Sequence, residues 1–174
     1  MDPTDLGERI CILGQSASGK STLAAALGQA RGLPVVHLDQ LRHVPGSRWV
    51  VRPDPEFEAL HAAAVAEERW VIEGNYSRWL ESRLERATGL ILLEVSTPTS
   101  LLRNVHRSST VERHPRVGDL GGGDTLTWER VRFIVGQSGA ARRRRAAVFA
   151  ETDLPKVRLS GTRAIRDFCR RASA

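Results

Sequence analysis

Short apolar runs alternate with segments of helical periodicity along the whole chain. The run at 89–95 is apolar at nearly every position, as expected for a strand that is covered on both faces. Between about 55 and 68, Phe57, Leu60 and Ala64 recur at helical spacing. This alternation predicts a parallel sheet covered by helices. We expect its strands at 9–13, 35–38, 70–72, 89–95 and 156–159.

The predicted helices lie between these strands, at about 22–27, 55–68, 77–86 and 126–150, with others beginning near Pro98 and Thr162. The connection at 108–126 is different, because it holds Pro115 and four glycines but few apolar residues. A long connection without secondary structure is typically a functional loop. We therefore predict one domain over 1–174, with a substrate-binding insert at about 40–68 and a mobile lid at about 108–126.

A phosphate-binding pattern joins the first predicted strand to its helix. The segment 14–21 reads GQSASGKS and fits G-x-x-x-x-G-K-[ST]. In this setting the helix N-terminus directs free N–H groups at an anion, Lys20 reaches the β- and γ-phosphates, and Ser21 binds Mg²⁺. The pattern predicts a bound nucleoside triphosphate. The residues expected to contact it are Gly14, Gln15, Ser16, Ala17, Ser18, Gly19, Lys20, Ser21 and Thr22.

Composition limits the class of protein further. No apolar run approaches the roughly 20 residues of a membrane span, and the N-terminal residues are acidic and polar, unlike a targeting signal. Cys11 and Cys169 form neither a disulfide framework nor a metal-spacing pair, so we expect a reduced, cytoplasmic setting. The net charge of +6 includes the arginine run 142–145. This charge suits a protein that handles nucleotides, and it leaves nucleic-acid binding as an alternative.

Two further segments carry a family resemblance. His37-Leu38-Asp39 follows the phosphate loop, and 70–76 then reads WVIEGNY. Together with the arginine-bearing helix after the fourth strand, this order resembles the adenylate-kinase-like P-loop kinases, and most closely the bacterial topology modulation proteins. The resemblance implies a three-layer α/β/α P-loop NTPase fold with a five-stranded parallel sheet in the order 2-3-1-4-5. It also implies ATP and Mg²⁺ as cofactors.

The resemblance implies roles for single residues as well. Asp39 would orient or deprotonate the acceptor, Glu73 would hold the water shell of Mg²⁺ beside Ser21, and Arg103 would lie against the adenine. Arg107 would bind phosphates, and Arg116 in the lid would neutralise charge on the transferring group. Two structural alternatives stay open: an Asp that only begins a loop, and a solvent-facing basic helix. The expected catalytic set is Lys20, Asp39, Arg107 and Arg116.

The acceptor is expected beside Asp39, in the insert and just after the third strand. Cations and an aromatic ring there suit an anionic or ring-bearing acceptor. We predict an ATP-dependent phosphotransferase that acts on a nucleotide or a hydroxyl metabolite. A nucleotide-switched DNA- or RNA-binding protein and a regulatory ATPase are the alternatives. The candidate substrate-binding residues are Asp39, Arg42, Arg52, Gly74, Asn75, Tyr76 and Arg78.

Overall fold

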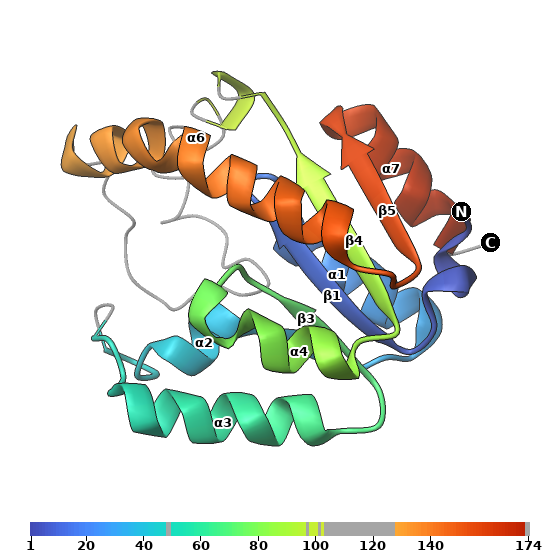
Figure 1. The fold of residues 1–174 in the computed structure, drawn as a ribbon, viewed down its shortest axis with the longest axis horizontal. Helices are drawn as coiled ribbons and strands as arrows, with labels where there is room; N and C mark the ends of the chain where they lie inside the picture. Colours follow the sequence, from blue (N-terminus) through green and yellow to red (C-terminus); the bar gives the residue numbers. More distant parts are fainter. Residues whose placement is uncertain (48–49, 97, 101, 103–127, 173–174) are drawn as a thin grey trace.

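Five parallel strands form the centre of the protein (Figure 1). A computed structural model describes residues 1–47, 50–96, 98–100, 102 and 128–172, with the backbone alone for 128–138. The strand order is β2-β3-β1-β4-β5, and every neighbouring pair is parallel, which confirms the predicted topology. The strands are β1 (Arg9–Gly14), β2 (Val35–His37), β3 (Trp70–Glu73), β4 (Gly89–Glu94) and β5 (Lys156–Ser160).

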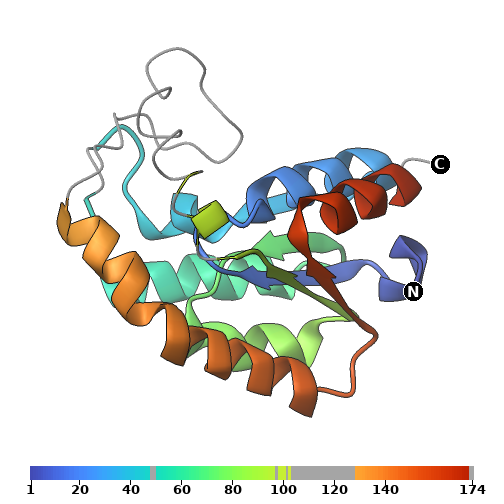
Figure 2. The ribbon, with the colours of Figure 1, turned by 90° about the horizontal axis from the view of Figure 1, so that it is seen from above.

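Helices cover both faces of this sheet, so the three-layer fold is also confirmed. Figure 2 shows α1 and α7 side by side on one face and α3, α4 and α6 on the other. None of the helices in the described part of the chain is long and apolar enough to cross a membrane. The helices are α1 (Lys20–Arg31), α2 (Leu38–Arg42), α3 (Asp54–Ala66), α4 (Leu80–Arg86), α6 (Trp128–Glu151) and α7 (Gly161–Ala172), with short 3-10 helices η1 (Pro3–Leu6) and η2 (Ser77–Trp79).

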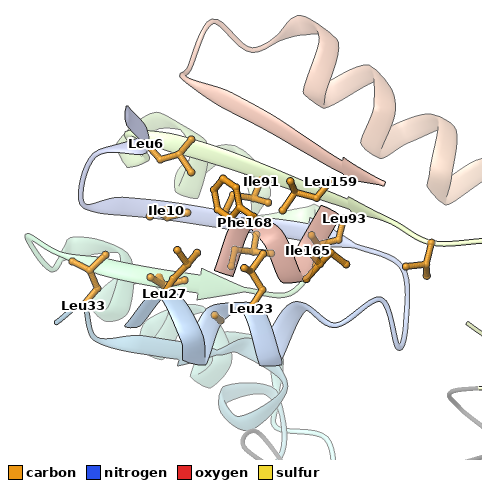
Figure 3. Packing of buried hydrophobic residues seen from close by; sticks show 14 residues of the cluster. Leu6, Ile10, Leu23, Leu27, Leu33, Ile91, Leu93, Leu159, Ile165 and Phe168 are labelled. Atoms are coloured by element: carbon orange, nitrogen blue, oxygen red, sulfur yellow. The ribbon is translucent and has the colours of Figure 1, made fainter. Parts of the chain in front are cut away.

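Each face of the sheet has its own apolar core. In the cluster under α1 and α7, Leu23 and Leu27 pack with Ile10, Ile91 and Phe168 (Figure 3). The opposite cluster joins alternate residues of the same strands to α2, α3 and α4. The members of this second cluster include Cys11, Leu13, Leu38, Val65, Ile72 and Leu80. Strands buried on both faces explain why the apolar runs of the sequence are nearly continuous.

The second strand is one residue shorter than predicted, and this changes the setting of Asp39. β2 ends at His37, and Leu38 begins the short helix α2, so Asp39 lies in the first turn of a helix and not at a strand end. Leu38 is fully buried against the opposite core and satisfies the apolar pattern from the helix. A short apolar run does not by itself distinguish these two conformations. The predicted lid at 108–126 lies outside the described residues.

Candidate functional site

The phosphate loop lies between β1 and α1 at the carboxyl edge of the sheet, where ligands of open parallel sheets bind. Ala17 and Gly19 have positive φ angles of 53° and 99°, so the backbone changes hand twice before the helix begins. Such alternation directs successive amides into a concavity suited to an anion. Gly14 lies where a Cβ would come within 2.8 Å of the Leu93 carbonyl oxygen, so this position has no room for a side chain.

One hydrogen bond within this loop and two to residues outside it fix its position. Lys20 Nζ donates to the Gln15 carbonyl at 3.0 Å, so its ammonium group lies over the loop. Gln15 Nε2 donates to the carbonyl of Val95 at 2.6 Å, and Ser100 Oγ donates to that of Ser16 at 2.8 Å. The loop is therefore held by residues that follow β4 in the sequence.

Ser21 and Glu73 meet beside the loop. Ser21 Oγ donates a 2.9 Å hydrogen bond to Oε1 of Glu73, and His37 Nδ1 lies 3.0 Å from the same oxygen. Glu73 is buried, with 4% of its surface exposed. Burial raises the pKa of its carboxyl, but the bond with His37, the charge of Lys20 and the bond from Ser21 together outweigh this, and the pKa is lowered. An ionised carboxylate beside a hydroxyl is an oxygen donor set that fits Mg²⁺.

The turn after β3 connects the loop to the acceptor side. Asn75 Oδ1 accepts a hydrogen bond from the Gly14 amide at 3.2 Å, and the Tyr76 hydroxyl donates to Asp39 Oδ1 at 2.6 Å. Gly74 has a φ of 132°, and a Cβ there would come within 2.9 Å of Leu38. The packing of α2 therefore requires a glycine here, at a position that was predicted from the sequence to bind substrate.

Asp39 lies beside a cluster of aromatic rings and arginines. Phe57 packs against Tyr76 and, edge-on, against Trp79, with ring centroids 5.2 and 4.8 Å apart. Arg42 lies over the Phe57 ring, 5.3 Å from its centroid. Arg42 and Arg78 both contact the carboxylate of Asp54, at 2.7 and 2.5 Å. Hydrogen bonding from Arg42, with the charges of both arginines, lowers the pKa of Asp54.

The structure therefore brings Asp39, Arg42, Asn75, Tyr76 and Arg78 together at one edge of the sheet. Arg52 is occupied differently: its Nε donates to the Leu41 carbonyl at 3.0 Å, and its Nη1 lies 3.5 Å from Glu56. Thr22 is exposed on the first turn of α1. The predicted nucleotide arginines Arg103 and Arg107 and the lid arginine Arg116 lie outside the described residues.

Three buried polar residues near the site were not predicted from the sequence. His37 contacts Glu73, Arg83 contacts the turn after β3, and the His61 ring packs at a tilt against Phe57 with 5.9 Å between the centroids. The position of His37 in the His-Leu-Asp segment, two residues before Asp39, is a sequence signal that could have identified the first of these. Arg83 and His61 occur in helical segments with ordinary polar composition, so the sequence carried no sign of their burial.

Part of the basic charge that suggested nucleic-acid binding is compensated within the chain. Arg142 and Arg158 lie 3.6 and 3.9 Å from the two oxygens of Glu94. On α7, Asp167 contacts Arg163 and Arg170 at 4.0 and 2.5 Å. These exposed contacts contribute little stability. They do reduce the positive electrostatic potential that α6 and α7 present to a polyanion.

Comparison with solved structures supports the same fold. A shikimate kinase from Bacteroides thetaiotaomicron aligns with a TM-score of 0.56 and 20% identity, over 94% of this chain and 95% of the other. A gluconokinase from Sinorhizobium meliloti 1021 aligns with a TM-score of 0.54 and 16% identity, over 96% and 90%. No protein-family model and no curated protein sequence matches the chain. At this identity the likeness shows a shared fold and not a shared activity.

Proposed function

We propose that the protein transfers the terminal phosphoryl group of ATP to a hydroxyl group of a small molecule. The proposal is based mainly on the contacts made by the residues at the end of β3 and in the turn that follows it. Glu73 and Asn75 contact the phosphate loop, and Tyr76, in the same turn, contacts Asp39. A triphosphate bound at the loop would therefore lie beside the proposed acceptor site, and this supports in-line transfer, which needs the two reactants to be adjacent.

The proposed reaction is a displacement at the γ-phosphorus of ATP. The acceptor oxygen forms a bond to the γ-phosphorus as the bond to the bridging oxygen breaks, and the acceptor's proton passes to the Asp39 carboxylate. The products are a phosphate ester and a nucleoside diphosphate. Lys20 and the loop amides bind phosphate oxygens and stabilise the charge that spreads over them. Asp39 is exposed at this edge, and of its two carboxylate oxygens only Oδ1 accepts a hydrogen bond from the described residues.

Ser21 would bind Mg²⁺ directly, and Glu73 would bind it through a water molecule. The bound ion would offset the negative charge of the β- and γ-phosphates. His37 also helps to fix the Glu73 carboxylate, because its Nδ1 contacts the same Oε1 atom that accepts from Ser21. The roles of Arg103, Arg107 and Arg116, and the finer resemblance to the topology modulation proteins, belong to the same proposal.

The cluster beside Asp39 supports an acceptor with an anionic group. Arg42 and Arg78 share the single carboxylate of Asp54, so the three side chains carry a net charge of about +1. Arg78 is the more exposed of the two, with 67% of its side-chain surface accessible. Its guanidinium can exchange Asp54 for a ligand carboxylate or phosphate at small cost, because exposed ion pairs are weak.

The test is a labelled-transfer screen. The protein is incubated with Mg²⁺, γ-labelled ATP and separate pools of hydroxy acids, sugar acids, nucleosides and nucleoside monophosphates. We expect label in one acid or phosphate pool, no transfer by Lys20→Ala, and a large loss in Asp39→Asn. Asp153→Asn, an exposed change in the loop before β5, is the matched control and should leave transfer unchanged. Label released only as free phosphate would support a regulatory ATPase and contradict the kinase proposal.

A further inference from the structure

Arg83 is a fully buried arginine on α4, with no exposed surface. It forms no ion pair with a carboxylate in the described part of the chain. Its guanidinium instead donates to three successive carbonyls of the turn after β3. Nη1 reaches Gly74 at 2.8 Å, and Nη2 reaches Asn75 at 2.6 Å and Tyr76 at 3.3 Å. A single guanidinium group therefore binds the carbonyl oxygens of three successive residues in this turn.

Burying the charged guanidinium of Arg83 costs free energy. Burial removes water from the guanidinium and lowers its pKa. The turn that it holds is itself unusual, because Gly74 has a φ of 132° and Tyr76, which is not a glycine, has a φ of 29°. Uncommon backbone conformations of this kind persist only where the surroundings fix them. Arg83 supplies that restraint from inside the protein.

The outward side of the same turn reaches both halves of the proposed site. Asn75 accepts from the amide of Gly14, at the start of the phosphate loop, and Tyr76 donates to Asp39. We propose that Arg83 is a positioning residue for phosphoryl transfer, whose three bonds set the relative placement of the phosphate loop and Asp39. This inference rests on the proposed function, and Arg83 itself touches neither partner of the reaction.

Lysine is the informative replacement. It keeps the positive charge and much of the length, but its ammonium group is a point donor and cannot reproduce the planar arrangement of Nη1 and Nη2 on three carbonyls. Arg83→Lys therefore loosens the turn while keeping a charge at its centre. Arg86→Lys is the matched control: it lies three residues later on α4, is exposed, and donates to the Ala66 carbonyl away from the site.

The chain offers a direct probe, because Tyr76 is its only tyrosine. Tyrosine labelled with carbon-13 at Cζ gives one resonance that reports the hydrogen bond to Asp39. The Asp39→Asn variant gives the reference chemical shift of this resonance in the absence of the carboxylate. We expect Arg83→Lys to move the resonance towards that position or to broaden it, and Arg86→Lys to leave it at the wild-type position. An unmoved resonance in folded Arg83→Lys would overturn the inference.

Turnover provides the second readout. With the acceptor pool that gives transfer, Arg83→Lys should lower kcat by roughly 10- to 100-fold, as a small misplacement of reacting groups does. It should change the ATP dissociation constant much less. Tyr76→Phe should then cost less in Arg83→Lys than in wild type, because both changes act through one contact. If Tyr76→Phe lowered kcat by the same factor in Arg83→Lys as in wild type, a positioning role would be contradicted.

Wild-type protein keeps the inference testable if Arg83→Lys does not fold. Guanidinium protons of a fully buried arginine exchange slowly and are observable by nitrogen-15 NMR. Saturation with Mg²⁺ and a non-hydrolysable ATP analogue should shift the Arg83 signals through Asn75, and Asn75→Ala should abolish that shift. An Arg83 signal that ignores bound nucleotide would overturn the inference. No binding heat and no transfer in wild type would instead contradict the proposed function, whatever the NMR shows.

Discussion

The hydroxyl of Tyr76 donates a hydrogen bond to Oδ1 of Asp39, with 2.6 Å between the two oxygens. Burial and the adjacent Asp39 charge raise the pKa of the Tyr76 phenol well above its ordinary value. The phenol therefore remains protonated, and remains a donor, throughout the neutral pH range. Asp39 is oriented by a neutral side chain that comes from the turn contacting the phosphate loop.

Tyr76→Phe tests the importance of this hydrogen bond. The phenyl ring keeps its contact with Phe57, and only the donor is lost. Hydrogen bonds to charged groups contribute about 1.5–3 kcal/mol, so we expect kcat/KM for the acceptor to fall by roughly 10- to 100-fold. The ATP dissociation constant, measured by calorimetry, should not change. An unaltered kcat/KM would mean that Asp39 does not need this donor.

Glu73→Gln tests the proposed magnesium site. The amide keeps the size of the side chain and an acceptor for Ser21 but removes the negative charge. We expect the Mg²⁺ concentration for half-maximal turnover to rise by roughly 10- to 100-fold, as for other outer ligands of metal sites. Glu94→Gln is a matched control, because Glu94 is also the last residue of a strand, β4, and contacts arginines instead of Ser21. An equal effect of both variants would argue for a general loss of negative charge.

The sheet was largely predictable from the sequence. Continuous apolar runs identified the strands, and the GQSASGKS segment located the phosphate loop between the first strand and α1. The strand order came from the family resemblance, because alternation alone specifies parallel pairing but not which strands are neighbours. The end of β2 was misjudged since Leu38 is equally apolar in a strand or a buried helical turn.

The candidate site was only partly predictable, because its interactions join residues far apart in the sequence. Ser21 and Glu73 were both expected at the metal, and they lie in contact. The sequence did not single out Arg83, since no local pattern distinguishes a buried arginine from a solvated one. Its partners are main-chain carbonyls, which have no signature in the side-chain sequence. Burial of this kind follows from how α4 packs onto the sheet.

Gly74→Ala should destabilise the protein through two independent effects. A φ of 132° is strained for alanine, and the new Cβ would lie 2.9 Å from Leu38. We expect the free energy of unfolding, measured in urea, to fall by about 3 kcal/mol or more. Gly46→Ala is the control: its φ is 71° and nothing lies within 4 Å of the added Cβ, so it should cost about 1 kcal/mol. Equal losses of unfolding free energy in the two variants would show that the Leu38 side chain moves aside without an energetic cost.

His61 should make the protein less stable in mild acid. Its ring is buried on α3, with 2% exposed, and its Nε2 has no hydrogen-bond partner in the described part of the chain. Burial, with the nearby Arg83 charge, lowers the pKa of His61 to about 4. In the unfolded chain a histidine has a pKa near 6.5. As the pH falls from about 6.5 towards 4, the unfolded state binds a proton that the folded state does not.

The contribution of neutral His61 is therefore complete above about pH 6.5 and is lost as the pH falls, by at most about 3 kcal/mol near pH 4. His61→Leu removes the titrating ring and keeps an apolar side chain of similar size. Urea unfolding at several pH values should show a shallower decline for this variant than for wild type. His43→Gln, in the loop after α2, should retain the wild-type decline. A decline that is equally steep in His61→Leu would assign the acid sensitivity to other groups.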